Sequence, residues 1–379
     1  MAYESVDHLQ RLMTEEFFGY AKDSKKAAGR ALGTIVEILT FYLLKSWGLM
    51  ASIAIERRIP EFGNATITHN VEYSLHPVFE EYRLRIPRDN KSITVHHLLK
   101  SLTAAEIDIS AFDRINNTLL SRDVILRNAC TIARGPDSYL VASIIGMEEH
   151  HILVSVAKQG LSPYGIFECK RVGVEEGTKK GPQTIEKAKQ GAYVARTVSS
   201  LQKVRLESGE IFGIIYDGVE ILRSGPYRLL LEEVIRSTDS RLLRDFVLTV
   251  GVVSNHGNWF TSDNHNKELR VLAQSYDWLL FLTDEGLTEF IEETIRNPNE
   301  DYQNIRQAFL DSYGPHRTKN QFTKVQMNFS ADRQLLLYFK RNAKRIASWF
   351  NVIAPEGGSL KQLQQEISLL RDKPWERIK

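Results

Sequence analysis

Apolar and polar positions follow the period of a helix through the first part of the chain. Between residues 5 and 50 apolar side chains recur every three or four places, and the polar segment 21–29 separates two such runs. The run 35–50 is interrupted by Glu37 and Lys45, and it is shorter than the roughly 20 apolar residues that span a bilayer. We therefore predict a buried helix there and no membrane contact.

The period changes to two in the following segments, which is typical of β-strands. Residues 52–59 and 67–75 alternate and are rich in β-branched side chains, with a turn between them. Residues 92–134 return to a helical period, so we predict an inserted helical segment there. We expect an antiparallel meander from three strand-like runs, 138–145, 150–157 and 164–172.

The second half of the chain combines two strongly apolar runs with many helical ones. Residues 246–254 are almost wholly apolar, as expected for a strand buried on both faces, and residues 278–283 read as its neighbour. Beyond residue 287 the pattern is mainly helical. We predict an α/β fold in which helices flank a mixed central β-sheet, with residues 1–285 as the core and 286–379 as a helical C-terminal region.

The composition is that of a cytoplasmic globular protein. Apolar residues make up 42% of the chain, and 49 Lys and Arg accompany 47 Asp and Glu, so any phosphate-binding surface has to be local. The two cysteines, Cys130 and Cys169, exclude a disulfide framework, and no Cys/His spacing indicates a structural zinc site. The N-terminal residues include acids and lack the basic start and apolar run of a signal peptide, so we expect a cytoplasmic location.

The triplet Glu168-Cys169-Lys170 carries the clearest chemical signal. On a strand, residues two apart share a face, so the carboxylate and the ammonium group point to one side while Cys169 points to the other. A carboxylate can hold Mg²⁺, and a nearby Lys can orient or deprotonate a water molecule that attacks a phosphodiester. Exposed pairs of this type are common and weak, but here the triplet follows an apolar segment, where unpaired charge is costly. This context favours a catalytic role.

The triplet and its surroundings resemble the PD-(D/E)XK nuclease superfamily. Over residues 28–285 the chain has the family's order of elements: a helix with an inward Glu37, two alternating strands, the GIFECKRV strand, a helix after a basic Gly-rich loop, and a buried strand. The polar loop and the helix with Gln190 make it most similar to type II restriction endonucleases. The resemblance implies a restriction-endonuclease-like core, site-specific cleavage of double-stranded DNA with Mg²⁺ (or Mn²⁺ in its place), and a homodimer.

Two other functions agree with the same residues. One is a different DNA nuclease of the superfamily, acting in repair, recombination or modification-dependent cleavage. The other is a non-enzymatic DNA-binding or interaction protein in which the triplet is structural. Metal-dependent cleavage separates the nucleases from the third possibility.

A second carboxylate has to share the metal ion with Glu168, and two candidates exist. Asp137 follows Pro136 and lies 31 residues before Glu168, but Gly-Pro-Asp is also ordinary turn chemistry. Glu72 lies on the second alternating strand, 96 residues before Glu168, where the resemblance implies an acidic residue. Its context makes Glu72 the favoured ligand. Glu37 is expected either as an outer ligand, holding a metal-bound water or Lys170, or as a buried Glu bonded to a neighbour.

Polar residues after the catalytic strand are candidate contacts to substrate. Gln190 is expected near the active site because its helix follows that strand. Contacts to phosphates are expected from a Gly-rich loop and the start of the next helix, by Lys179, Lys180 and Lys187, although such side chains are often only solvated. Contacts to bases are expected from the end of the buried strand, by Asn255, His256 and Asn258, with a capped turn as the alternative. The C-terminal region would contact DNA or form the dimer.

Overall fold

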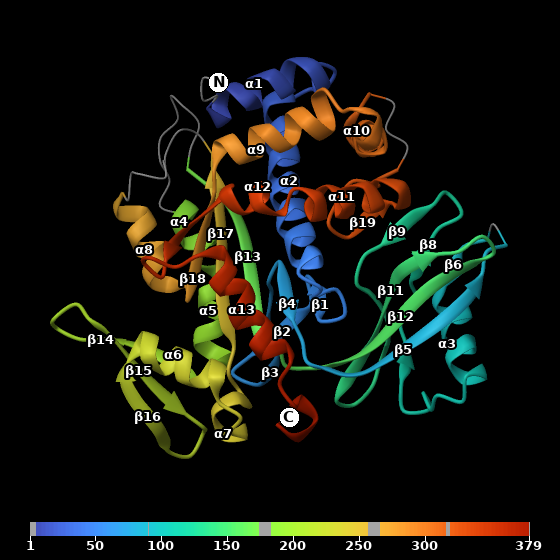
Figure 1. The fold of residues 1–379 in the computed structure, drawn as a ribbon. Coiled ribbons are helices and arrows are strands. Elements are labelled where there is room, and N and C mark those ends of the chain that lie inside the picture. The colour runs from blue at the N-terminus through green and yellow to red at the C-terminus, as the bar shows by residue number, and fades with distance from the viewer. Residues whose placement is uncertain (1–4, 90, 174–182, 257–265, 316–318, 379) are drawn as a thin grey trace.

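The computed structural model describes residues 5–89, 91–173, 183–256, 266–315 and 319–378 (Figure 1). These residues form a mixed α/β arrangement with five sheets, of six, five, four, three and two strands. The α/β class is therefore confirmed. The prediction of one central sheet is too simple, because much of the chain between residues 78 and 160 builds sheets of its own.

The six-stranded sheet contains the predicted catalytic strand. In spatial order its strands are β1 (Ile53–Ile55), β4 (Tyr73–Leu75), β13 (Gly165–Val172), β17 (Leu248–Asn255), β18 (Trp278–Leu282) and β20 (Phe350–Ala354). β4 is antiparallel to both β1 and β13, whereas β13, β17 and β18 run parallel to one another. Every residue of β17 and β18 is buried, which confirms the prediction of two neighbouring buried strands.

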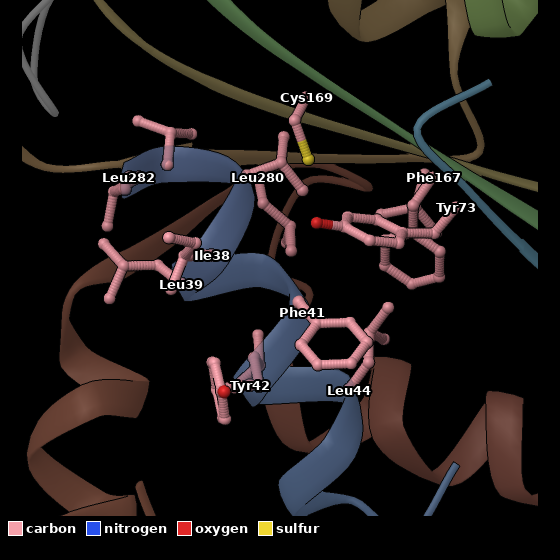
Figure 2. Close-up of a cluster of buried hydrophobic side chains, with 14 of the residues drawn as sticks. Ile38, Leu39, Phe41, Tyr42, Leu44, Tyr73, Phe167, Cys169, Leu280 and Leu282 are labelled. Carbon is pink, nitrogen blue, oxygen red and sulfur yellow. The ribbon is translucent and has the colours of Figure 1, made fainter. Parts of the chain in front are cut away.

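Helix α2 (Ser24–Ser46) packs against one face of this sheet. Figure 2 shows Phe41 of this helix beside Tyr73 and Phe167 of the sheet, with Cys169 pointing toward the same helix. Among the described helices, α2 alone is long and apolar enough to cross a membrane, and 67% of its most apolar window is buried inside the protein. The predicted buried helix is therefore present, since a core helix of a globular protein has this composition.

The opposite face of β13 is covered by α4 (Gln183–Ala188) and α5 (Gln190–Val198), and α8 (Lys267–Ser275) contacts α4 and β18. Ile166 packs in one cluster with Val194 of α5, whereas Phe167 belongs to the cluster on the α2 side. Because side chains alternate along a strand, Glu168 and Lys170 share the α5 face with Ile166.

A second lobe lies beside the main sheet, on the right in Figure 1. Its five-stranded sheet runs in the order β5 (Val78–Pro87), β12 (His151–Gly160), β11 (Ser138–Met147), β10 (Cys130–Arg134) and β7 (Asp113–Arg114). A four-stranded sheet runs in the order β19 (Gln326–Asn328), β9 (Ile125–Arg127), β8 (Thr118–Leu120) and β6 (Ile93–Thr94). The lobe also contains one helix, α3 (Val95–Ala104).

The predicted helical insertion at 92–134 is therefore wrong beyond α3. The segments 113–134 are short strands, and apolar positions spaced three or four apart over so few residues fit either structure. The expected meander is half right: β11 and β12 pair antiparallel, but β13 leaves them and joins the six-stranded sheet.

Smaller elements complete the first three quarters of the chain. They are α1 (Val6–Phe17), the hairpin of β2 (Arg58–Glu61) and β3 (Asn64–Asn70), the three-stranded sheet of β14 (Leu201–Arg205), β15 (Ile211–Tyr216) and β16 (Ile221–Pro226), and the helices α6 (Tyr227–Arg236) and α7 (Ser240–Leu243).

The C-terminal region is mostly helical, as predicted, but it is not separate from the core. Its helices are α9 (Asp284–Ile291), η1 (Glu292–Arg296), η2 (Glu300–Tyr302), α10 (Gln303–Tyr313), α11 (Phe329–Arg341), α12 (Ala343–Ser348), α13 (Leu360–Arg371) and η3 (Trp375–Arg377). Strand β20 closes the six-stranded sheet beside β18, and the largest hydrophobic cluster extends from Val6 to Ile378. The predicted boundary after residue 285 falls inside α9.

Candidate active site

Two buried acidic residues, Glu72 and Glu168, lie next to each other where β4 begins beside β13. The strands pair with Tyr73 opposite Phe167, and Glu72 immediately precedes β4, next to Glu168. The backbone N–H of Glu72 donates a hydrogen bond of 3.3 Å to Glu168 Oε2. Their exposed fractions are 7% and 2%. The structure thus brings together the two acids that the sequence paired across 96 residues.

Lys170 lies next to Glu168, as alternation on the strand requires. Its Nζ is 2.7 Å from Glu168 Oε1, and a third of the Lys side chain is exposed. Burial raises the pKa of Glu168 above its ordinary value, against the opposing attraction of Lys170, and the negative charge of Glu37 adds to the increase. Desolvation lowers the pKa of Lys170, but its interactions with Glu168 outweigh this effect and the pKa is raised. Lys170 is therefore an ammonium donor in this arrangement.

A second lysine, Lys324, lies on the other side of Glu72. Its Nζ is 3.1 Å from Glu37 Oε2 and 2.8 Å from Glu56 Oε1, and it also contacts Glu72 Oε1. Only 6% of Lys324 is exposed. Lys324 was not among the residues predicted from sequence, because nothing in the neighbouring residues encodes a partner almost three hundred positions away.

The second lobe fixes the position of Lys324. The side chain of Asn128, which follows β9, donates a hydrogen bond of 3.0 Å to the carbonyl of Lys324, and its backbone N–H donates one of 2.8 Å to the carbonyl of Val325. β9 then pairs with β19 immediately after this segment. The lobe thereby holds a C-terminal side chain against the acids of the main sheet.

The cluster has the charge and the donor atoms for a divalent cation. It consists of Glu37, Glu56, Glu72, Glu168, Lys170 and Lys324. Four carboxylates against two ammonium groups leave a formal charge of −2. Across the described parts of the chain no three His, Cys, Asp or Glu side chains converge as a ready-made metal cage. Mg²⁺ needs no such cage, since one or two carboxylates with water and phosphate oxygens commonly hold it. Glu72 and Glu168 fit that donor set.

Helix α5 approaches Glu168 closely at Gly191. A Cβ atom on Gly191 would lie 2.8 Å from Glu168 Cβ and 3.3 Å from the hydroxyl of Tyr276. That hydroxyl donates a hydrogen bond of 2.6 Å to the carbonyl of Ala188, which fixes the end of α4. Gln190, the predicted active-site residue of this helix, is half-buried next to Gly191. Gly191 was not predicted from sequence as a site residue, although it immediately follows Gln190, which was.

We expect Gly191→Ala to displace Glu168 and to slow any reaction that this carboxylate supports. The added methyl group meets the Cβ of Glu168, which cannot rotate away, and a displacement on the order of 1 Å costs roughly a hundredfold in rate. The matched control is Gly33→Ala in α2, where a Cβ would meet nothing within 4 Å. Cleavage rates of both proteins with Mg²⁺ make the comparison. Equal rates would show that the close approach at Gly191 is unimportant.

Asp137, the alternative metal ligand, lies elsewhere. It is exposed in the turn between β10 and β11, and its Oδ1 accepts a hydrogen bond of 3.0 Å from Ser138 Oγ. The structure therefore gives Asp137 the geometry of a turn residue.

The predicted DNA-contacting residues fall into three groups. Lys187 is exposed on α4, whereas Lys179, Lys180 and Asn258 lie outside the described residues. Asn255 is fully buried: its Nδ2 donates a hydrogen bond of 3.0 Å to Asp284 Oδ1. His256 is half-buried, and its backbone N–H donates to the carbonyl of Val172. The prediction of a base contact by Asn255 is thus wrong, because its side chain is buried and bonded to Asp284 at the start of α9.

Comparisons of the chain with protein families, with curated proteins and with solved structures found no match.

Proposed function

We propose that the chain is a Mg²⁺-dependent endonuclease of the PD-(D/E)XK superfamily, of the type II restriction class, that cleaves double-stranded DNA. One observation carries the proposal: Glu168 and Lys170 share a face of β13, and Glu72 from the neighbouring antiparallel strand lies directly beside Glu168. Glu168 and Lys170 are placed by strand β13 itself, and Glu72 is placed by the bend that leads directly into β4, the antiparallel neighbour of β13.

The order of elements around this site supports the proposal. Helix α2 carries Glu37, strands β1 and β4 follow, β13 carries the Glu-x-Lys pair, α5 crosses the sheet, and β17 returns parallel to β13. This is the order that the resemblance implies for the nuclease core. The second lobe is then a large insertion between β4 and β13, and it accounts for the 96 residues between the two acids.

Each residue of the cluster has a chemical role in this reaction. Glu72 and Glu168 would hold the cation, which supplies positive charge next to the negative charge that develops on the phosphate. Lys170 would donate a hydrogen bond to the attacking water or to a phosphate oxygen. Because Glu168 raises the pKa of Lys170, that pKa would fall if Glu168 bound the cation instead of Lys170. Glu37 lies at the edge of the cluster and orients Lys324. Double-stranded DNA as substrate and a homodimer remain part of the proposal.

Digestion of a sequenced plasmid with Mg²⁺, followed by mapping of the ends, tests this function. We expect discrete fragments from the unaltered protein and a rate roughly 10²–10⁴-fold lower with Lys170→Ala, because that is the usual contribution of a positioned acid or base. Lys26→Ala is the control, since Lys26 is exposed at the start of α2 and belongs to neither the cluster nor the predicted DNA contacts. A smear would indicate a general nuclease. Intact plasmid and genomic DNA with both Mg²⁺ and Mn²⁺ over a broad range of salt would refute the enzymatic function.

A further inference from the structure

A cavity of about 420 Å³ opens beside the acidic cluster, between the main sheet and the second lobe. Its volume lies within the roughly 300–1,000 Å³ of typical ligand sites. Glu37 and Glu56 line one wall, and Lys324 lies at the junction with the buried carboxylates. The remaining wall comes from the lobe and the C-terminal region and is polar, with Arg127, Asn320, Thr323 and Gln326. Lys324, which also contacts Glu72, therefore connects the cavity with the proposed metal site.

Arg127 lines this cavity and has no acidic partner among the described residues. It ends strand β9, is half-buried, and forms no hydrogen bond or ion pair with the described side chains. The carboxylates across the cavity do not engage it, because Glu37 and Glu56 are already paired with Lys324. A partly desolvated guanidinium group with no acidic partner favours an anionic ligand, and its planar array of donors matches a phosphate.

The backbone around Arg127 is rigid enough to make it a defined binding group. Arg127 pairs with Gln326 in the β9–β19 ladder. The next residue, Asn128, is buried and donates two hydrogen bonds to the segment that carries Lys324. The same local structure thus positions Arg127 in the cavity and Lys324 against the acids. A ligand that spans the cavity would touch both the lobe and the acids Glu37 and Glu56, which Lys324 links to Glu72.

We propose that this cavity holds the sugar-phosphate backbone of the DNA strand next to the bond that is cut, with Arg127 as a direct ligand of a phosphate. This inference rests on the proposed function and deepens it, because it assigns the second lobe to substrate binding. Asn320, Thr323 and Gln326 supply neutral donors along the same wall. The carboxylates of the opposite wall would repel the strand by themselves, so its approach depends on the cations of the cluster.

The test measures binding of a fluorescent DNA duplex by anisotropy at several salt concentrations, with Ca²⁺ replacing Mg²⁺ to prevent cleavage. We expect Arg127→Gln to bind roughly ten- to a hundredfold more weakly and to lower the slope of log affinity against log salt by about one, because one phosphate contact is lost. Arg127→Lys should keep the slope and lose only part of the affinity. Arg114→Gln is the control, since Arg114 is an exposed arginine of the same lobe, on β7.

The outcomes separate this inference from the function on which it rests. If the unaltered protein and Arg127→Gln bind the duplex equally, with equal salt slopes, Arg127 is not a phosphate ligand, although the nuclease proposal stands. If Arg127→Lys binds as poorly as Arg127→Gln with the lower slope, a charge-specific contact is likewise refuted. If the unaltered protein neither binds nor cuts DNA, both proposals fail. Thermal unfolding of each variant confirms that the fold is intact before binding is compared.

Discussion

A Glu72→Gln protein should cleave DNA at least about a hundredfold more slowly than the unaltered chain, whereas Asp137→Asn should cleave at the unaltered rate. Glu72 is buried beside Glu168 and contacts Lys324, so its carboxylate is the second oxygen donor that the cluster offers a cation. Gln keeps the shape and removes the negative charge. A metal ion contributes several kcal/mol to stabilising the transition state, and about 1.4 kcal/mol corresponds to tenfold in rate.

Initial cleavage rates over a range of Mg²⁺ concentrations provide the measurement. A loss of metal affinity appears as a higher Mg²⁺ requirement for Glu72→Gln, together with the lower maximal rate. Asp137→Asn is the matched control, because Asp137 is exposed in a turn and its bond to Ser138 is local. An inactive Asp137→Asn beside a fully active Glu72→Gln would reverse the assignment of the second metal ligand.

Lys324→Met should destabilise the metal-free protein by about 3–5 kcal/mol, and Mg²⁺ should restore much of that loss. Lys324 and Glu72 form a buried ion pair, and removing one partner of such a pair leaves the other uncompensated, which typically costs this amount. Here the substitution leaves the carboxylates of Glu37, Glu56 and Glu72 close together without their shared ammonium group. A divalent cation can replace it, and a ligand at a hundred times its dissociation constant stabilises the folded state by about 2.7 kcal/mol.

Chemical unfolding with and without Mg²⁺ measures this effect. The control is Lys45→Met, because Lys45 forms an equally buried pair with Asp332, 2.6 Å away, and contacts none of the carboxylates that Lys324 contacts. Both variants should be less stable than the unaltered chain. Only Lys324→Met should recover in Mg²⁺. Equal responses of the two variants to Mg²⁺ would mean that the carboxylates around Lys324 bind no cation.

The parts of the site that could be predicted from sequence are those that a single strand or helix determines. Glu168 and Lys170 had to share a face of β13, and Cys169 had to point to the other layer, because strand geometry leaves no alternative. The burial of α2 followed in the same way from its apolar residues. The contact between Glu72 and Glu168 was a hypothesis from the resemblance, and the antiparallel pairing of β4 with β13 supplied its geometry.

The parts that sequence did not predict depend on pairing between distant segments. Strand β9 obtains its partner β19 about two hundred residues further along the chain, and without that partner its three residues read equally well as part of a helix. Lys324 reaches the acids only because this pairing holds its backbone. Asn255 looked like a surface residue because it follows an apolar run and precedes polar ones, but Asp284 binds it inside the fold.

Lys324 and β20 follow the strands β4, β13 and β18 in the chain, and this order has a consequence for biosynthesis. A nascent chain on the ribosome contains Glu72, Glu168 and Lys170 long before it contains the ammonium group that neutralises Glu37 and Glu56. The outer edge of strand β18 also stays unpaired until residues 350–354 have been synthesised and form β20. Strands β13 and β18 therefore reach their final arrangement only after residues 324–354 have been synthesised, so a polypeptide that stops before them would carry Glu72 and Glu168 without Lys324 and with an unpaired sheet edge.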